Sequence, residues 1–287
     1  MLSYGTQIGK MIFLQADENV TWLAPYAYTI VLLGFGFFLF RVFENWFAST
    51  YDRPLYRHWL VYRKLNRSQL AILEAEVPYF NMLDRKRKRQ FVHRVATFLK
   101  EKQFVGRDEL VIDERMKVLV AAVGCMLSFG RKNYLYDLIA VILIYPGEFY
   151  SNINKAMHIG EFNPQGRALV LSWPDFERGH DITNDNRNLG IHEFMHAMQL
   201  EAKQSRDLDS TRYAKQFQNI LKRLTDQEVK NQLDKTRFFR EYAFTNQYEF
   251  MAVLSEYFIE SPAEFQKLFP NIYDYLKRLL NFRYGNY

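Results

Sequence analysis

The segment Ile191–Ala197 contains residues whose types and spacing could do chemistry, in the pattern H-E-x-x-H at His192, Glu193 and His196. Residues four apart in an α-helix lie on the same face, so both imidazoles would point to one place. Glu193 would lie about 100° around the helix, near enough to reach a water molecule held there. Two neutral imidazoles beside a carboxylate are typical of a zinc site with an adjacent general base.

A helix must hold this motif, and the residues around it have helical periodicity. Four apolar residues recur at the spacing i, i+3, i+4 and i+7: Ile191, Phe194, Met195 and Met198. They predict a buried face, and the two histidines share a separate polar face with Gln199 and Lys203. The run 184–186 (Asn-Asp-Asn) offers capping residues for the start of this helix. A surface helix with two solvated histidines is the alternative, which the apolar face disfavours.

A catalytic zinc site usually has three protein ligands, so the motif needs a third residue. No histidine follows His196, and a ligand C-terminal to it would therefore be a carboxylate. Residues 246–258 predict a helix on which Glu249 and Glu256, seven apart, share one face. This spacing leaves the ligand role open between them. Asn246-x-x-Glu249 also has the form of a capping box, in which the glutamate would only stabilise its own helix start.

A strand and a hairpin are predicted upstream of the motif. Residues 138–145 are rich in β-branched side chains and end before a Pro-Gly pair, as is typical of a buried strand. Residues 157–159 and 168–173 flank a turn signal at 163–166, and together they predict a hairpin. In zinc peptidases an edge strand at this place can hold a peptide by main-chain pairing. We expect the substrate strand to end at Ser172-Trp173.

Three further side chains have types that occur in active sites. His158 and His180 could act as extra metal ligands or substrate contacts, although ordinary surface or hydrogen-bonded histidines are the commoner case. Cys125 falls in residues 116–127, a strongly apolar predicted helix behind Asp113 as its cap. We expect it to pack as a small hydrophobic side chain without a catalytic role.

Residues 85–89 form an uninterrupted basic run, Arg-Lys-Arg-Lys-Arg, behind Asp84 as the expected N-cap of a helix. Such a run can bind nucleic acid or anionic lipid. No aromatic residue interleaves the charges, which favours a solvated helix turn. We expect no direct binding of nucleic acid, and a nearby membrane would make lipid the better functional candidate.

The N-terminal region predicts a single membrane span. No charged residue occurs between Asn19 and Phe40, and the apolar run 22–40 is about long enough to cross a bilayer core. Lys10 is the only basic residue before this run, whereas six basic residues follow it within 41–67. The positive-inside rule therefore predicts that the part of the chain after the span lies in the cytoplasm. We expect an anchor in the inner, cytoplasmic membrane, with the catalytic domain facing the cytoplasm. A buried core helix is the alternative, and a signal peptide is disfavoured because no small-x-small cleavage site follows.

Composition sets broad limits on this chain of 287 residues. A hydrophobic share of 48% can build a sizeable core without disulfides, and Cys125 is the only cysteine, which fits a reducing compartment. The net charge of +6 identifies neither anionic membrane nor nucleic acid as a partner. We expect four parts: a tail at 1–18, the anchor at 19–45, a juxtamembrane connector at 46–67 and a catalytic domain at 68–287.

The chain resembles the MtfA family of zinc-dependent peptidases over most of residues 68–275. The segments that carry this resemblance are Arg94-Val95, Phe98-Leu99, 116–127, 141–149, 170–173, 188–196 and 249–258 followed by Ser261-Pro262. The resemblance implies an α+β fold that is mostly helical and zincin-like (gluzincin), with a small mixed sheet. The N-terminal span is additional to the soluble pattern of the family.

The resemblance also implies roles for individual side chains. His192, His196 and Glu249 would hold zinc, which decides the open choice of third ligand. Glu193 would be the general base, and Tyr242, seven residues before the third ligand, would help to stabilise the tetrahedral intermediate. The family commonly continues H-x-L-D after the second histidine, whereas this chain has Ala-Met-Gln at 197–199. The amide of Gln199 would then take the place of the aspartate.

We predict a zinc-dependent metallopeptidase that hydrolyses peptide or protein substrates with zinc-activated water and Glu193 as general base. The resemblance also implies an alternative, a regulatory protein that binds a transcriptional repressor linked to sugar uptake, with peptidase activity secondary. An intact Glu193 favours the enzyme, because a pure binder needs no base beside its ligands. A structural zinc site is disfavoured, since such sites usually close all four positions with cysteine and histidine.

Overall fold

The computed structural model describes residues 23–51 and 62–282, and the chain divides between Asp52 and Arg53 into two compact units. The tail predicted at 1–18 lies outside the described residues. The predicted anchor and connector fall partly within them. Each unit is considered by itself.

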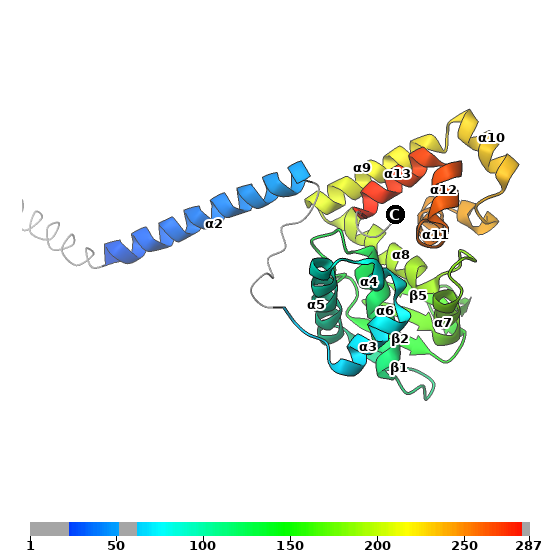
Figure 1. Ribbon diagram of the computed structural model, residues 1–287, viewed down its shortest axis with the longest axis horizontal. Coiled ribbons are helices and arrows are strands. Elements are labelled where there is room, and N and C mark those ends of the chain that lie inside the picture. The colour runs from blue at the N-terminus through cyan, green and yellow to red at the C-terminus, as the bar shows by residue number, and fades with distance from the viewer. Residues whose placement is uncertain (1–22, 52–61, 283–287) are drawn as a thin grey trace, which may run out of the picture. The chain divides into compact units, whose positions relative to one another are not determined.

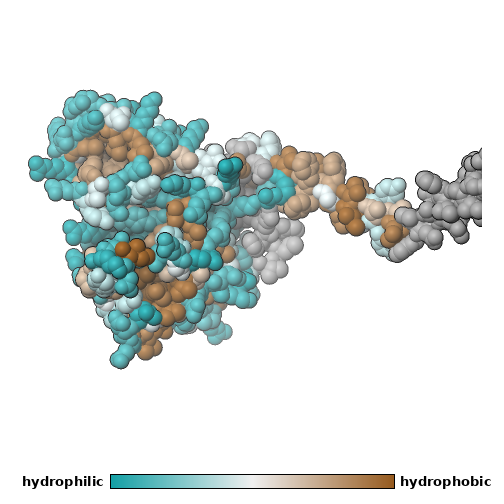
Figure 2. Space-filling model, turned by 180° about the vertical axis from the view of Figure 1, so that it is seen from behind, coloured by the Kyte–Doolittle hydropathy of each residue, from teal (hydrophilic) through white to brown (hydrophobic). Residues whose placement is uncertain are grey.

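The first unit contains one long helix, α2 (Ala24–Tyr51). Its window Ala24–Glu44 has a mean hydropathy of 1.8, and large apolar side chains such as Tyr28 and Ile30 are about 70% exposed. Figure 2 shows this helix largely in the brown of hydrophobic residues. By length and composition α2 is able to cross a membrane, and a signal sequence near the N-terminus would share these features. The helix continues six residues beyond the predicted anchor end at position 45.

The second unit is mostly helical with a small mixed sheet, as predicted (Figure 1). Four strands form the main sheet in the order β1 (Gln103–Gly106), β2 (Val141–Tyr145), β6 (Ala168–Ser172) and β5 (Gly160–Asn163). The first three run parallel, and β5 pairs antiparallel with β6 at the edge. All of β6 is buried, which fits a central strand covered on both faces. A separate antiparallel pair joins β3 (Phe149–Ser151) to β4 (Ala156–His158).

Four helices precede most of the sheet: α3 (Arg67–Glu76), α4 (Pro78–Met82), α5 (Arg85–Glu101) and α6 (Glu114–Leu127). The predicted N-caps of α5 and α6 are confirmed, because Asp84 and Asp113 each accept the backbone N–H three residues on. Cys125 is buried in α6, as expected, and burial raises the pKa of its thiol to about 12. This thiol has the character of a core side chain, not of a nucleophile.

Helix α8 (Leu189–Gln204) carries the H-E-x-x-H motif through the centre of this unit. It packs against α6, against α11 (Gln247–Glu260) and against the sheet edge. The contact with α6 depends on Gly124, where an added Cβ would lie 2.9 Å from the ring of Phe194. Phe194 is fully buried, so the apolar face predicted for the motif helix anchors it in the core.

The remaining helices surround α8 and α11: α7 (Trp173–Asp181), α9 (Leu208–Arg223), α10 (Gln227–Thr236), the 3-10 helix η2 (Glu241–Phe244), α12 (Pro262–Leu268) and α13 (Pro270–Leu280). In Figure 1, α9 and α13 run side by side in the yellow-to-red part of the chain, and their residues are in contact. Five aromatic rings pack with centroids 4.9 to 6.1 Å apart: Phe238, Phe239, Tyr257, Phe265 and Phe269. This cluster fixes the segment before η2 against α11.

The predicted hairpin exists, but its first strand was placed wrongly. Residues 156–158 form β4 and pair with β3, whereas β6 pairs with β5 at 160–163. The predicted substrate strand is also wrong, because β6 is bonded to β2 on one side and β5 on the other. Trp173 begins α7 instead of ending a strand. Within residues 23–51 and 62–282, the edge strand of the sheet on this side is β5.

The cap predicted at 184–186 is also wrong. The N-cap of α8 is Asn188, whose side chain accepts the N–H of Ile191 at 3.1 Å. Asn186 has a left-handed φ of 56°, so the chain turns there before the helix begins. The carbonyl of Asn186 accepts a hydrogen bond from Arg240, and its side chain accepts one from Ser261 at 2.8 Å.

Candidate metal centre

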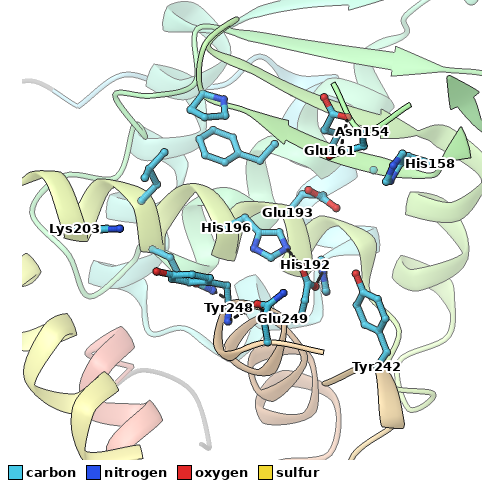
Figure 3. A pocket seen from close by; sticks show the side chains of 16 residues that line it. Asn154, His158, Glu161, His192, Glu193, His196, Lys203, Tyr242, Tyr248 and Glu249 are labelled. Carbon is cyan, nitrogen blue, oxygen red and sulfur yellow. Dashed lines mark hydrogen bonds and ion pairs between the residues drawn. The ribbon is translucent and has the colours of Figure 1, made fainter. Parts of the chain in front are cut away.

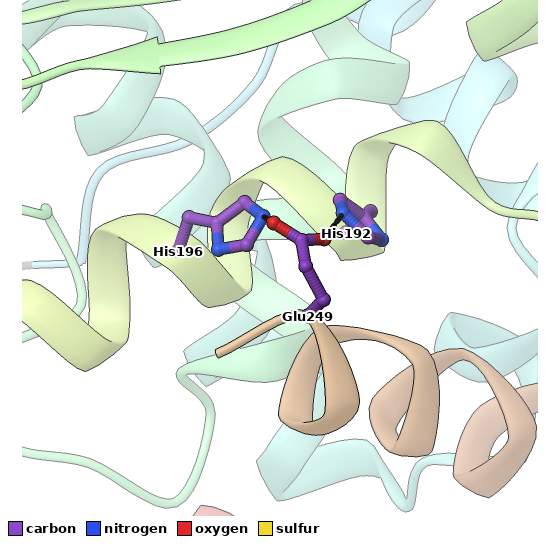
Figure 4. Close-up of side chains that lie close together, drawn as sticks. All are labelled: His192, His196 and Glu249. Carbon is purple, nitrogen blue, oxygen red and sulfur yellow. Dashed lines mark hydrogen bonds and ion pairs between the residues drawn. The ribbon is translucent and has the colours of Figure 1, made fainter. Parts of the chain in front are cut away.

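Three predicted side chains meet between α8 and α11. His192 and His196 project from one face of α8, and Glu249 projects from the first turn of α11 (Figure 4). His192 Nε2 lies 3.0 Å from Glu249 Oε2, and His196 Nε2 lies 3.5 Å from Glu249 Oε1. Asn246 caps α11 through the backbone N–H groups of Tyr248 and Glu249, which leaves the Glu249 carboxylate to face the histidines.

The donor atoms of this group fit a metal ion. They all lie within 4.8 Å of one another. Around a tetrahedral ion with bonds of about 2.0–2.1 Å, neighbouring ligand atoms are about 3.3 Å apart, and the two N–O separations of 3.0 and 3.5 Å bracket this value. Two imidazoles and one carboxylate are also a donor set that leaves a fourth position for water. The His-His-Glu group is therefore suited to bind a metal.

Glu256, the other carboxylate on this face of α11, lies behind the first histidine. Its Oε1 lies 2.7 Å from His192 Nδ1. Arg240 holds the same carboxylate with two hydrogen bonds of 2.7 and 2.8 Å, and the backbone N–H of Asn188 donates to it at 3.0 Å. A carboxylate on Nδ1 would leave Nε2 available to a metal ion and would fix both the tautomer and the ring orientation. The spacing of seven residues placed Glu256 on the correct face, but nothing in the sequence pointed to Arg240.

The carboxylates around His192 change its acidity. Burial alone would lower the pKa of His192, but hydrogen bonds with Glu249 and Glu256 raise it to about 10. Burial alone would raise the pKa of the Glu249 carboxyl group, yet the two histidines hold this pKa well below the usual range. Without an ion, the imidazole of His192 therefore keeps its extra proton between the carboxylates of Glu249 and Glu256. An incoming cation would take over the charge balance that this proton provides.

Glu193 lies on the cleft side of α8 and is buried (Figure 3). Burial raises the pKa of its carboxyl group above the ordinary value, although the two neighbouring histidines oppose this. A raised pKa suits a group that must take up and return a proton near neutral pH. Strand β5 covers this carboxylate at Gly160, where an added Cβ would lie 2.6 Å from Glu193 Oε1 and 2.5 Å from Leu189 Cδ1.

A Gly160→Ala variant is expected to displace the Glu193 carboxylate, because the new methyl group would occupy its place. Misplacing a reacting group by about an ångström can cost up to about 100-fold in rate. We expect peptide hydrolysis to fall about 10- to 100-fold, with the bound-metal content unchanged. Gly147→Ala is the matched control, because a Cβ there meets nothing within 4 Å. Equal rates for the two variants would contradict a tight contact between β5 and Glu193.

Tyr242 lies on η2 at the mouth of the site, and its side chain is 51% exposed. Its ring centroid is 6.0 Å from that of His192, and Figure 3 shows the phenol directed toward the metal group. Burial and the carboxylate of Glu249 raise the pKa of Tyr242 above the ordinary value. The phenol therefore keeps its proton at neutral pH and can act as a hydrogen-bond donor.

The metal group opens into a cleft of about 500 Å3. One wall is β5, including Gly160, Glu161 and Phe162, and the other comes from α8, η2 and the start of α11. His158 also lines this cleft, away from the metal group in Figure 3, whereas His180 lies on α7 and lines a different cavity. The edge strand and the metal group thus share one cavity.

Gln199, the residue at the position of the family's aspartate, also lines the cleft. Its amide donates to the carbonyl of Tyr248 at 3.1 Å. This bond ties α8 to the backbone immediately before Glu249. The side chain therefore helps to fix the spacing between the two helices.

Comparison with known proteins places this geometry in context. The sequence model of a family described as "Glucose-regulated metallo-peptidase M90" matches residues 53–281. An uncharacterized protein of Synechocystis is 26% identical over 252 residues, which cover 80% of this chain and 86% of the relative. Mlc titration factor A of Serratia proteamaculans is 23% identical over 219 residues, covering 70% and 82% of the two chains. The Yersinia pestis protein of that name is 24% identical over 239 residues, covering 75% and 87%.

Proposed function

Because this chain belongs to the glucose-regulated metallo-peptidase M90 family, which is the MtfA family, we propose that it is a zinc-dependent peptidase. One observation carries the proposal. A buried carboxylate, Glu193, lies beside a His-His-Glu group in a cleft bordered by a free strand edge. This combination supplies a metal site, a base and a place for an extended peptide. The zincin-like type of fold is part of the same proposal.

His192, His196 and Glu249 would hold the zinc ion. When bound, zinc would polarise the scissile carbonyl and make water more acidic. Glu193 would accept a proton from the attacking water and deliver it to the leaving amine, for which its raised pKa is suited. Tyr242 would donate a hydrogen bond to the oxyanion that develops on the carbonyl. Its exposed position on η2 allows it to reach a bound substrate.

We further propose that the substrate lies along β5. Among the strands that the structure describes, this one is bonded only to β6, and three of its residues line the cleft. An extended peptide could add to this edge by main-chain hydrogen bonds, with its side chains alternating toward and away from the cleft. The edge strand expected from sequence is thus reassigned from β6 to β5.

The test is cleavage of a mixed peptide library by the purified full-length chain in mild detergent. We expect hydrolysis that a zinc chelator abolishes and that added zinc restores. Mass spectrometry of the products would give the peptide preference. Cleavage that persists after complete removal of metal would overturn the proposal.

A second candidate function rests on the names of the relatives. The Serratia and Yersinia relatives bear the name Mlc titration factor A, which speaks of titrating a factor called Mlc. Carried to this chain, the name favours binding of a transcriptional repressor, with peptidase activity secondary. A chain that binds such a repressor equally well with and without zinc, and cleaves no peptide, would favour this candidate.

We propose that α2 anchors the chain in the cytoplasmic membrane. Its length and apolar surface support a span, and the basic residues that follow it support a cytoplasmic second unit. The predicted division into tail, anchor, connector and catalytic domain is kept as part of this proposal. Protease accessibility of the second unit in sealed inverted vesicles would test the orientation.

A further inference from the structure

A second cavity of the catalytic unit, separate from the metal centre, is strongly basic. It has a volume of about 500 Å3 and lies where the segment 62–64 meets the start of α5. Five cationic side chains and one carboxylate line it: Arg63, Lys64, Arg85, Lys88, Arg89 and Glu74. Subtracting the one negative charge from the five positive charges leaves +4 on its walls. We call this cavity the basic groove.

Most of the charge in the basic groove is available to a ligand. Arg63 lies 3.6 Å from Glu101, and Asp84 pairs with Arg87 outside the groove. Among the residues that the structure describes, Lys64, Arg85, Lys88 and Arg89 form no ion pair with a carboxylate. Clustered like charges without partners repel one another and favour the binding of anions.

Aromatic rings hold two of these cations in place. The guanidinium of Arg89 lies 4.9 Å from the ring centroid of Tyr62, and Lys88 Nζ lies 5.1 Å from that of Phe80. Such contacts orient a cation without neutralising it. The first turn of α5 adds the positive end of its helix dipole on the same side. The groove is thus organised for a compact anion, and its apolar residues Leu70, Phe80 and Val92 can contact a ligand that is also partly apolar.

We propose that the basic groove binds the phosphate headgroup of an anionic phospholipid. The inference rests on the proposed membrane anchoring by α2. Only ten residues, 52–61, separate Tyr51 at the end of α2 from Tyr62 in the groove. A membrane that holds α2 would therefore be tethered to this unit through a short stretch of chain, and its surface is rich in phosphate groups. Basic side chains close to a membrane surface are attracted to its anionic lipids.

The test uses the full-length chain in nanodiscs of phosphatidylcholine, with or without 30% phosphatidylglycerol. We expect backbone hydrogen exchange in residues 62–64 and 85–92 to slow at least threefold in the anionic discs. The double variant Arg85→Glu/Lys88→Glu should lose this protection. Acidic residues are favourable in the first turn of a helix, so α5 should still form. Lys215→Glu/Lys230→Glu is the matched control, because it changes the net charge equally on exposed positions of α9 and α10.

Each outcome decides the question. Equal exchange in both kinds of disc, or protection that survives the groove variant, would overturn the proposal. The same protection from 10 mM inorganic phosphate in neutral discs would assign the groove to a free phosphate instead of a lipid. Zinc content and peptide cleavage, measured on the same samples, should not change with the groove variant. Their absence in the wild-type chain would count against the peptidase and leave the lipid site standing.

Discussion

A Glu193→Gln variant is expected to keep its zinc and to lose peptide hydrolysis by at least about 100-fold, the smaller end of the usual contribution of a general base. Glutamine has nearly the same shape as glutamate, so the cleft and the ligands on either side of it should be undisturbed. It cannot accept a proton from water. Initial rates on a cleaved peptide, together with zinc analysis of the same preparation, would measure both effects.

The stability of this variant provides an independent check. In the folded chain without bound metal, burial raises the pKa of Glu193, so its ionised form costs folding free energy. The stabilisation from this carboxyl group is present below its unfolded pKa and is lost as the pH rises through the folded value. At a pH above the folded pKa of Glu193, the metal-free Glu193→Gln variant should unfold at no lower temperature than the metal-free wild type. Glu264→Gln, an exposed site on α12, is the matched control for rate and stability. A Glu193→Gln variant that cleaves as fast as this control would disprove the base assignment.

The metal group was the part of the site most accessible to sequence reasoning, because its spacing has a direct geometrical meaning. A spacing of four residues on a helix brings His192 and His196 to one face, and in the structure both lie on that face. The choice between Glu249 and Glu256 could not be made from spacing, since both lie on one face of α11. Only the position of α11 against α8 separates them, and this depends on packing between distant segments such as the Gln199–Tyr248 contact.

Strand β5 shows why the sequence pattern misplaced the first strand of the hairpin. The sequence placed the first strand of the hairpin at 157–159, immediately before Gly160. The structure uses this glycine within β5 because Glu193 packs where its side chain would be. The apolar residues before it suggested the strand and do form one, but with a different partner. The contact between Gly160 and Glu193 joins two distant segments, and no sequence pattern indicates it.

The basic run at 85–89 illustrates the same limit. In sequence no aromatic residue interleaves its charges, which favoured a solvated turn. In the fold, Tyr62 and Phe80 arrive from other segments and lie against Arg89 and Lys88. Arg240 is a similar case, because its contact with Glu256 joins residues 16 apart with no recognisable motif. Side chains assembled by tertiary packing leave no periodic signal along the chain.

Removal of Glu249 and removal of Glu256 are expected to affect zinc in different ways. Glu249→Ala deletes one of the three donors and leaves two imidazoles, so the purified variant should not retain stoichiometric zinc after dialysis. Glu256→Gln leaves all three donors in place but weakens the carboxylate contact with His192 and the pairing with Arg240. Loss of such an outer partner typically lowers metal affinity about 10- to 100-fold.

Competition with a chelator of known zinc affinity would measure the zinc affinities of the two variants on one scale. Glutamine is preferable to alanine at position 256, because Glu256→Ala would leave the partly buried Arg240 without its partner and could unfold the chain. Glu256→Gln should still bind one zinc ion per chain at high zinc concentration, whereas Glu249→Ala should not. The reverse result would exchange the roles of the two glutamates. Arg240 would then neighbour a metal ligand, and its positive charge would work against the ion that the site is built to hold.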